Sequence, residues 1–165
     1  MTQIGLQLKT LFLIHSEEIN QQAIISITKH CNNLNTLGLY NCDFNNVVVE
    51  IDEDESYFYY RRERDKDKLE LMLELSNLSI VSECPTNFIF LLLSSALNIQ
   101  HFKTGQNCAL TDDDLVKLLE VNQLKHLESF QIPASKHLSM KSVELLLTYC
   151  EDIRQGFNFW KRRFD

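Results

Sequence analysis

Apolar residues recur along the chain in a short frame whose first, fourth and sixth positions are apolar. The clearest copies read L-K-T-L-F-L from Leu8, L-N-T-L-G-L from Leu34 and L-S-N-L-S-I from Leu75. In all, the frame opens at six places: Leu8, Leu34, Leu75, Ile99, Leu127 and Ile153. Alternation of apolar with other residues is the pattern of a β-strand with one buried face. Each frame therefore predicts a short strand, and the last, where Gly156 replaces the second apolar residue, is degenerate.

The segments between the frames have the spacing of helices. Apolar residues three and four positions apart line one face of a helix, and three segments align on this spacing. They are Ile24, Ile27 and Cys31; Ile89, Leu92, Leu93 and Ala96; and Val143, Leu146, Leu147 and Cys150. A fourth segment continues the stripe with Leu115, Leu118 and Leu119. Ser16, Thr111 and Ser139 are predicted N-caps, and Pro85 suits a first helical turn.

The frames follow one another at a nearly constant distance. Successive frames begin 26, 41, 24, 28 and 26 residues apart. Four of these spacings fall in the range of about 20 to 29 residues that is typical of strand–helix repeats. No single unit buries its apolar residues alone, but stacked neighbours build one continuous core. The sequence predicts a single α/β domain over residues 1–165, a solenoid of about six strand–helix units with a parallel, concave sheet.

The spacing of 41 residues indicates an insertion at about 45–68. From Glu50 to Lys68 the sequence is first acidic, then aromatic, then mixed in charge, which is too polar for a core. The aromatic residues allow two interpretations, a partner-binding element or a segment that folds back on the second unit. They are Tyr57, Phe58, Tyr59 and Tyr60.

The second frame extends into a longer motif, C-x-x-L-x-x-L-x-L-x-x-C, from Cys31 to Cys42. With helix segments such as L-T-D-D-D-L-V-K-L-L from Leu110, it resembles the cysteine-containing class of leucine-rich repeats, the ribonuclease-inhibitor-like horseshoes of F-box proteins. The resemblance covers about Leu6 to Asn158 and implies a horseshoe arc that binds proteins. In that family the repeats recognise substrates for a Skp-cullin-F-box ubiquitin ligase. Only the repeat matches here, because no helical F-box segment precedes the first predicted strand.

Charge and hydropathy narrow the classes of partner. The formal net charge is -7, whereas nucleic-acid binding usually shows as clustered Lys and Arg. The longest apolar run, Phe88 to Leu93, is far shorter than the roughly 20 residues of a membrane-spanning helix. We therefore expect no nucleic-acid or membrane partner. Because no signal peptide is visible, we expect a cytoplasmic or nuclear protein.

The sequence contains no recognisable motif for catalysis or cofactor binding. It lacks G-x-S-x-G, G-x-x-x-x-G-K-[ST], G-x-G-x-x-G and H-E-x-x-H. The neighbours His30 and Cys31 would point about 100° apart on a helix, which makes them a poor catalytic pair. The five cysteines show no C-x-x-C spacing, and we expect them to be small buried side chains in a reducing compartment. We predict no enzymatic activity, no cofactor and no metal site.

The residues that alternate with the buried ones along the strands form the candidate binding surface. This concave set is polar in its middle and aromatic or aliphatic at both ends. Exposed aromatic residues beside a basic group are typical interface anchors. The predicted partner-binding residues, on the concave face and in a C-terminal aromatic patch, are Tyr40, His101, Lys103, Gln131, Arg154, Phe157, Phe159 and Trp160. For the C-terminal aromatic residues a second interpretation stays open, a cap over the last unit.

The predicted function is non-catalytic binding of a protein partner through the concave face. Two settings stay open, substrate recognition within a ubiquitin ligase and a scaffold or regulatory role unrelated to ubiquitin. The chain begins almost directly on a predicted strand, so the N-terminal edge of the solenoid has no predicted cap. This edge predicts self-association, unless an upstream segment or a partner covers it.

Overall fold

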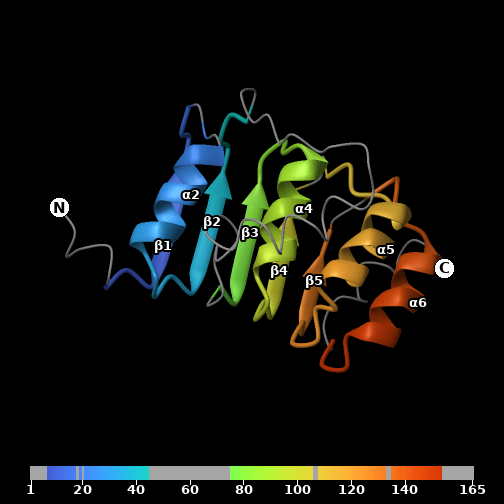
Figure 1. Ribbon diagram of the computed structural model, residues 1–165. Helices are drawn as coiled ribbons and strands as arrows, with labels where there is room; N and C mark the ends of the chain where they lie inside the picture. Colours follow the sequence, from blue (N-terminus) through green and yellow to red (C-terminus); the bar gives the residue numbers. More distant parts are fainter. Residues whose placement is uncertain are drawn as a thin grey trace, which may run out of the picture.

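The computed structural model is an α/β arrangement in which parallel strands alternate with helices (Figure 1). It describes residues 7–17, 19, 21–44, 75–105, 108–132 and 135–153. The elements are β1 (Thr10–Ile14), α2 (Gln21–His30), β2 (Thr36–Tyr40), β3 (Asn77–Val81), α4 (Thr86–Ser95), β4 (His101–Thr104), α5 (Asp112–Val121), β5 (Ser129–Gln131) and α6 (Met140–Tyr149). The insertion predicted at about 45–68 and the strand of the sixth frame lie outside the described residues.

The strands form one parallel sheet in the order β1-β2-β3-β4-β5, so each pairs with its neighbours in the chain. The register confirms the predicted frames, because residues at the same frame position pair across the sheet. The second apolar position, for example, forms a continuous row of Leu11, Leu37, Leu78, Phe102 and Phe130. This sequential order is compatible with a solenoid.

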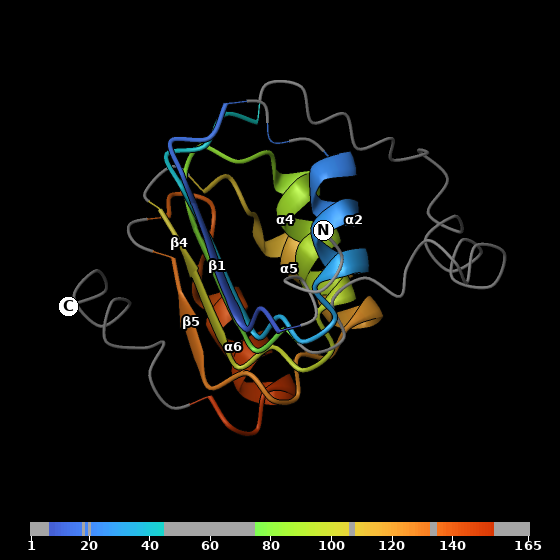
Figure 2. The same cartoon turned by 90° about the vertical axis from the view of Figure 1, so that its left-hand side faces the viewer.

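The helices lie on one side of the sheet, as the edge-on view in Figure 2 shows. The core fills the space between the two layers. The inward side chains of the three central strands are almost fully buried, and so are Phe88, Leu92 and Leu93 of α4. The rings of Phe102 on β4 and Phe130 on β5 contact each other at a tilt of 46°, with centroids 5.4 Å apart. At the end of the sheet, Leu11 and Leu13 of β1 are only half-buried, because β1 has a strand neighbour on one side alone among the described strands.

Two of the predicted helix starts are confirmed. Thr111 caps α5 in a capping box, in which its hydroxyl accepts from the Asp114 N–H at 3.1 Å and the Asp114 carboxylate accepts from the Thr111 N–H at 2.9 Å. Ser139 caps α6, and its Oγ accepts from the Lys141 N–H. Pro85 occupies the position just before the first residue of α4.

Ser16 is not an N-cap, and this prediction is wrong. The helix that follows begins at Gln21, too far along the chain for the Ser16 hydroxyl to reach its first turn. Ser16 instead belongs to the turn that leaves β1, where its carbonyl accepts from the Asp43 N–H at 3.0 Å.

The predicted buried face of α6 is correct except at Leu147, whose side chain is 57% exposed. Val143, Leu146 and Cys150 face inward and are buried. Leu147 lies about 100° further round the helix from Leu146. Among the described helices only α5 packs against α6, so nothing in this part of the chain covers that side.

Side-chain hydrogen bonds tie successive helices to one another. Asn122, after α5, donates from Nδ2 to the carbonyls of Leu93 and Ala96 at 2.7 and 3.2 Å, and its Oδ1 accepts from the Leu124 N–H at 3.1 Å. These bonds hold the C-terminal end of α4 against the segment that leaves α5.

A second tie joins the N-terminal ends of α5 and α6. The Asp112 carboxylate accepts from the Ser139 N–H at 2.9 Å, from the Ser139 hydroxyl at 2.6 Å and from the Ser142 hydroxyl. Lys141 pairs with Asp113 at 3.3 Å. Partial burial acts to raise the pKa of Asp112, but the hydrogen bonds from Ser139 and Ser142 and the charge of Lys141 outweigh it, so the pKa lies below its ordinary value.

The turns that leave β2 and β5 each carry a bonding side chain eight residues after the first residue of the frame, Cys42 after Leu34 and Ser135 after Leu127. The Cys42 thiol donates to the carbonyls of Leu13 and Tyr40 at 3.4 and 3.5 Å. The Ser135 hydroxyl accepts from the N–H groups of His137 and Leu138. These side chains therefore give backbone groups in and beside the two turns a hydrogen-bond partner.

Candidate functional site

One face of the sheet carries no helix among the described elements (Figure 2). Because side chains alternate along a strand, this face holds every second residue. The register arranges them in three rows, which together we call the open face. The rows are Thr10, Thr36, Asn77, His101 and Ser129; Phe12, Gly38, Ser79, Lys103 and Gln131; and Ile14, Tyr40 and Val81.

At the β1–β2 end of the open face lies an aromatic cluster of Phe12, Ile14 and Tyr40 around Gly38. The rings of Phe12 and Tyr40 are tilted by 57° with centroids 5.8 Å apart. Phe12 is 52% exposed and Ile14 is 59% exposed. A Cβ at Gly38 would lie 2.4 Å from Cδ1 of Phe12 and 2.5 Å from Cε2 of Tyr40. The missing side chain of Gly38 is therefore what lets the two rings lie down on the sheet.

The middle of the open face is polar, and its amides and hydroxyls bond to one another. Asn77 donates from Nδ2 to the Asn35 side-chain oxygen at 3.2 Å and to the Ser76 hydroxyl at 2.9 Å. Thr36 donates to the same Asn35 oxygen at 3.3 Å. These bonds to residues just before β2 and β3 orient Thr36 and Asn77, the two members of the first row at the centre of the sheet.

The β4–β5 end of the open face is cationic. His101 and Lys103 stand two residues apart on β4, and both are exposed. Neither side chain makes a hydrogen bond or ion pair with another residue in the part of the chain that the structure describes. Lys103 is flanked in the register by Ser79 and Gln131. Gln131 in turn donates to the Ser129 hydroxyl at 3.0 Å.

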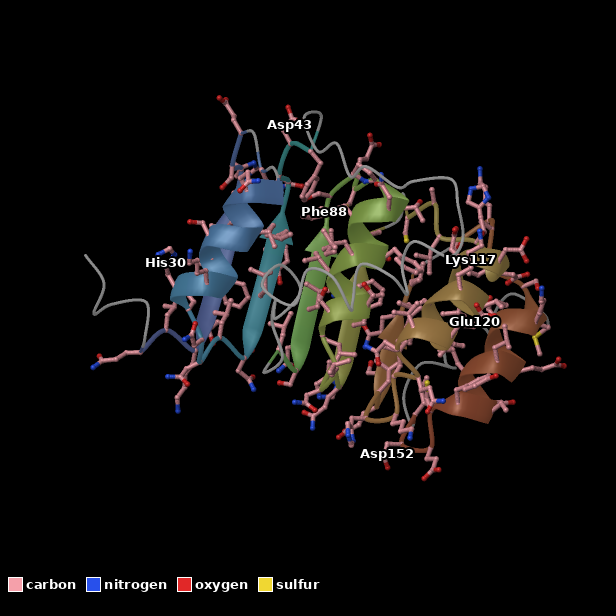
Figure 3. All side chains as sticks on the ribbon, viewed as in Figure 1. His30, Asp43, Phe88, Lys117, Glu120 and Asp152 are labelled. Carbon is pink, nitrogen blue, oxygen red and sulfur yellow. The ribbon has the colours of Figure 1, made fainter. Side chains whose placement is uncertain are left out.

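None of the described residues of the open face is Asp or Glu. Lys117 and Glu120 lie on the outer side of α5, Asp43 beyond the end of β2 and Asp152 after α6 (Figure 3). The cationic end of the open face therefore stands out from a chain whose formal net charge is -7.

The structure brings four of the predicted site residues onto one surface. Tyr40, His101, Lys103 and Gln131 all lie on the open face, on β2, β4 and β5. Lys103 and Gln131 are register partners, whereas β3 separates Tyr40 from them. The other four predicted residues lie outside the described residues, and their role stays a prediction. They are Arg154, Phe157, Phe159 and Trp160.

Phe12 and Ile14 are the members of the aromatic cluster that sequence reasoning left out of the candidate site. The strand pattern places both residues on the concave side, but it gives no reason to choose them as binding residues over the other concave positions. The available signal is the pairing of Phe12 with a glycine at the same frame position of the next unit. A large aromatic residue beside a glycine on a neighbouring strand indicates a ring that lies across the sheet.

The thiols of Cys84 and Cys150 are buried and have raised pKa values, whereas a reactive cysteine is accessible and has a lowered pKa. Four of the five cysteines are buried, as predicted, and Cys31 is half-buried. Burial raises the pKa of Cys84, and the nearby thiols of Cys108 and Cys42 raise it further. Burial also raises the pKa of Cys150, from 9.0 to about 12. These side chains keep their protons at neutral pH, whereas a nucleophile or metal ligand needs the thiolate.

The described residues hold no group of three His, Cys, Asp or Glu side chains that could bind a metal ion. Over the same ranges, no helix is long and apolar enough to cross a membrane. The arrangement on the open face offers apolar contact at one end and positive charge at the other, on a preformed backbone. Comparison with known proteins adds no relative, since no family model and no curated protein matches the chain.

Proposed function

We propose that this chain is a leucine-rich-repeat arc that binds a protein partner, without catalysis, through the open face of its sheet. The repeat assignment is supported by the match of the frames to the consensus L-x-x-L-x-L-x-x-N/C-x-L and by the pairing of like frame positions on neighbouring strands. Helices on one side and sequential strands are the geometry expected of such repeats.

The observation that carries the proposal is the exposed apolar end of an otherwise polar sheet face on which no described helix lies. Phe12 and Ile14 are each more than half exposed, although water disfavours such surface. Contiguous exposed apolar side chains next to polar and charged groups are typical of contact sites for other proteins. The five strands present these groups on one rigid frame, so a partner meets a surface that needs little reordering.

Within this proposal the module serves either as the substrate-recognition part of a ubiquitin ligase or as a scaffold or regulatory protein. Both settings use the same face. They differ in the proteins that accompany the chain in the cell, namely an adaptor and a cullin in the first setting and neither in the second.

The experiment that tests the proposal is site-specific photo-crosslinking of the full chain in its own cells. A benzophenone amino acid replaces Ser79, which lies in the middle row of the open face, or Glu120, which is exposed on the outside of α5. We expect a protein crosslinked from position 79 and absent from position 120. Crosslinks from position 120 alone, or equal products from both positions, would refute the proposal. An adaptor and a cullin in the purified product identify the ligase setting.

A further inference from the structure

We infer that the partner of the open face is an acidic, extended segment with an apolar anchor. Its apolar side chain packs on the aromatic cluster of Phe12, Ile14 and Tyr40, and its carboxylate meets Lys103 and His101. This inference rests on the proposed function and adds to it the chemistry of the partner.

Charge complementarity selects an acidic partner. His101 and Lys103 are exposed and bond to no other described side chain, and the described open face contains no carboxylate that would neutralise them. The whole chain is acidic, with a formal net charge of -7, whereas the described open face carries a lysine and no Asp or Glu, so it favours the approach of a carboxylate. An ion pair at an exposed site gains little free energy in water, so the pairing acts mainly on specificity and association rate.

The apolar anchor is selected by the aromatic cluster. Phe12 lies against Tyr40 and over Gly38, so its ring is held by the sheet and does not project freely into solvent. Glycine in the middle of a strand is unfavourable for the strand itself, and such a residue often marks a place where another group approaches the backbone closely. Here that group is the Phe12 ring. A ring already held in place loses little conformational entropy when a partner packs on it.

The distance from the aromatic cluster to Lys103 sets the number of residues between the apolar anchor and the acidic residue of the partner segment. Neighbouring strands lie about 4.8 Å apart, and β3 is the one strand between Tyr40 on β2 and Lys103 on β4. The two features are thus about 10 to 14 Å apart across the strands. An extended chain advances about 3.3 Å per residue, so the anchor and the acidic residue are about three to four positions apart.

The test is a selection of random 12-residue peptides displayed on phage against the full chain, followed by fluorescence anisotropy with the enriched peptides as synthetic probes. We expect the enriched peptides to share an acidic residue three or four positions from an aromatic or branched aliphatic residue. Lys103→Glu should weaken their binding about tenfold. A peptide with its acidic residue changed to lysine should bind the Lys103→Glu variant better than it binds the wild type.

Matched variants separate the site from general effects of charge and packing. Lys117→Glu makes the same charge reversal on the outer side of α5 and should leave binding unchanged. Gly38→Ala displaces the rings of Phe12 and Tyr40 and should weaken binding. Gly105→Ala, just after β4, is the control for the glycine change because its added Cβ lies 3.5 Å from the nearest atom, the Cα of Val81, at ordinary contact distance.

Three outcomes would overturn the inference: enriched peptides without an acidic residue, equal effects of Lys103→Glu and Lys117→Glu, or a selection that enriches no binder. If crosslinks form at position 79 in cells while the enriched peptides are neutral or basic, the proposed function stands and the acidic-segment inference is wrong. If position 79 gives no crosslink, the proposed function itself is wrong.

Discussion

Asn122 gives the sharpest prediction about stability. Its side chain is only 6% exposed and makes three hydrogen bonds, to the carbonyls of Leu93 and Ala96 and from the Leu124 N–H. In Asn122→Ala the Leu93 carbonyl and the Leu124 N–H lose this partner in a buried place, whereas the Ala96 carbonyl still accepts from the Ile99 N–H at 3.3 Å. A hydrogen bond contributes about 0.5 to 1.5 kcal/mol net, and a buried group left without a partner costs about 1 to 3 kcal/mol. Since two of the three backbone groups lose this partner, we expect a loss of about 3 kcal/mol.

Urea unfolding followed by circular dichroism measures this loss as a fall in the midpoint at constant slope. Gln123→Ala is the matched control, because Gln123 carries a similar amide on the exposed side of the same segment. This control should change the free energy of unfolding by less than about 0.5 kcal/mol. Asn122→Asp keeps the acceptor for Leu124 but, when ionised, offers no donor to Leu93 and Ala96, so it should destabilise as well.

A loss below about 1 kcal/mol for Asn122→Ala would refute the reasoning, because that is the value of one ordinary hydrogen bond. It would mean that the Leu93 carbonyl finds another donor once the amide is gone. A changed slope would point instead to a loss of cooperativity between the units that Asn122 joins.

Three further predictions concern the hydrogen bonds of Asp112, the buried thiol of Cys150 and the two faces of α6. Asp112→Ala should lower the free energy of unfolding by about 1 kcal/mol at pH 7. Because the folded pKa of Asp112 is lowered, its contribution is present at neutral pH and the difference from the wild type should shrink as the pH falls below 3.8; a difference that grows in acid would contradict this. Burial raises the pKa of Cys150 from 9.0 to about 12, so the folded thiol keeps its proton while the unfolded one ionises. Stability should therefore decline as the pH rises from about 9 towards 12, and at pH 8 iodoacetamide should label Cys31 before Cys150, as peptide mass spectrometry can follow. On α6, Leu146→Ala should cost about 2 to 5 kcal/mol and shift the melting temperature strongly, whereas Leu147→Ala should stay within about 0.5 kcal/mol; equal effects would mean that Leu147 is buried.

The strands were predictable because their signal is local and repeated. Leu34, Leu37 and Leu39 alone would be a weak pattern, but the same spacing at Leu75 and Ile99 fixes both the strand and its register. The capping box at Thr111 was predictable for the same reason, since a helix start depends on residues a few positions apart. Ser16 shows the limit, because the same residue type also suits the turn that leaves a strand.

Features that depend on which elements are neighbours were not predictable. The exposure of Leu147 follows from what packs beside α6, not from the spacing along α6. The bonds of Asn122 reach back 29 and 26 residues, to Leu93 and Ala96, and no short motif encodes them. The aromatic cluster likewise needs the pairing of Phe12 with Gly38, which becomes visible once the register is known.

The sequential order of the strands has a consequence for how binding on the open face can change. Each described strand pairs only with its neighbours in the chain, so the aromatic cluster on β1 and β2 and the side chains of His101 and Lys103 on β4 stand on strands that do not pair with each other. Changes at sites without shared partners add nearly independently in free energy. Under the proposed binding mode, substitutions on β1 and β2 should change the affinity for the partner's apolar side chain, and substitutions on β4 should change the preference for its acidic residue. The two properties can therefore be adjusted one at a time.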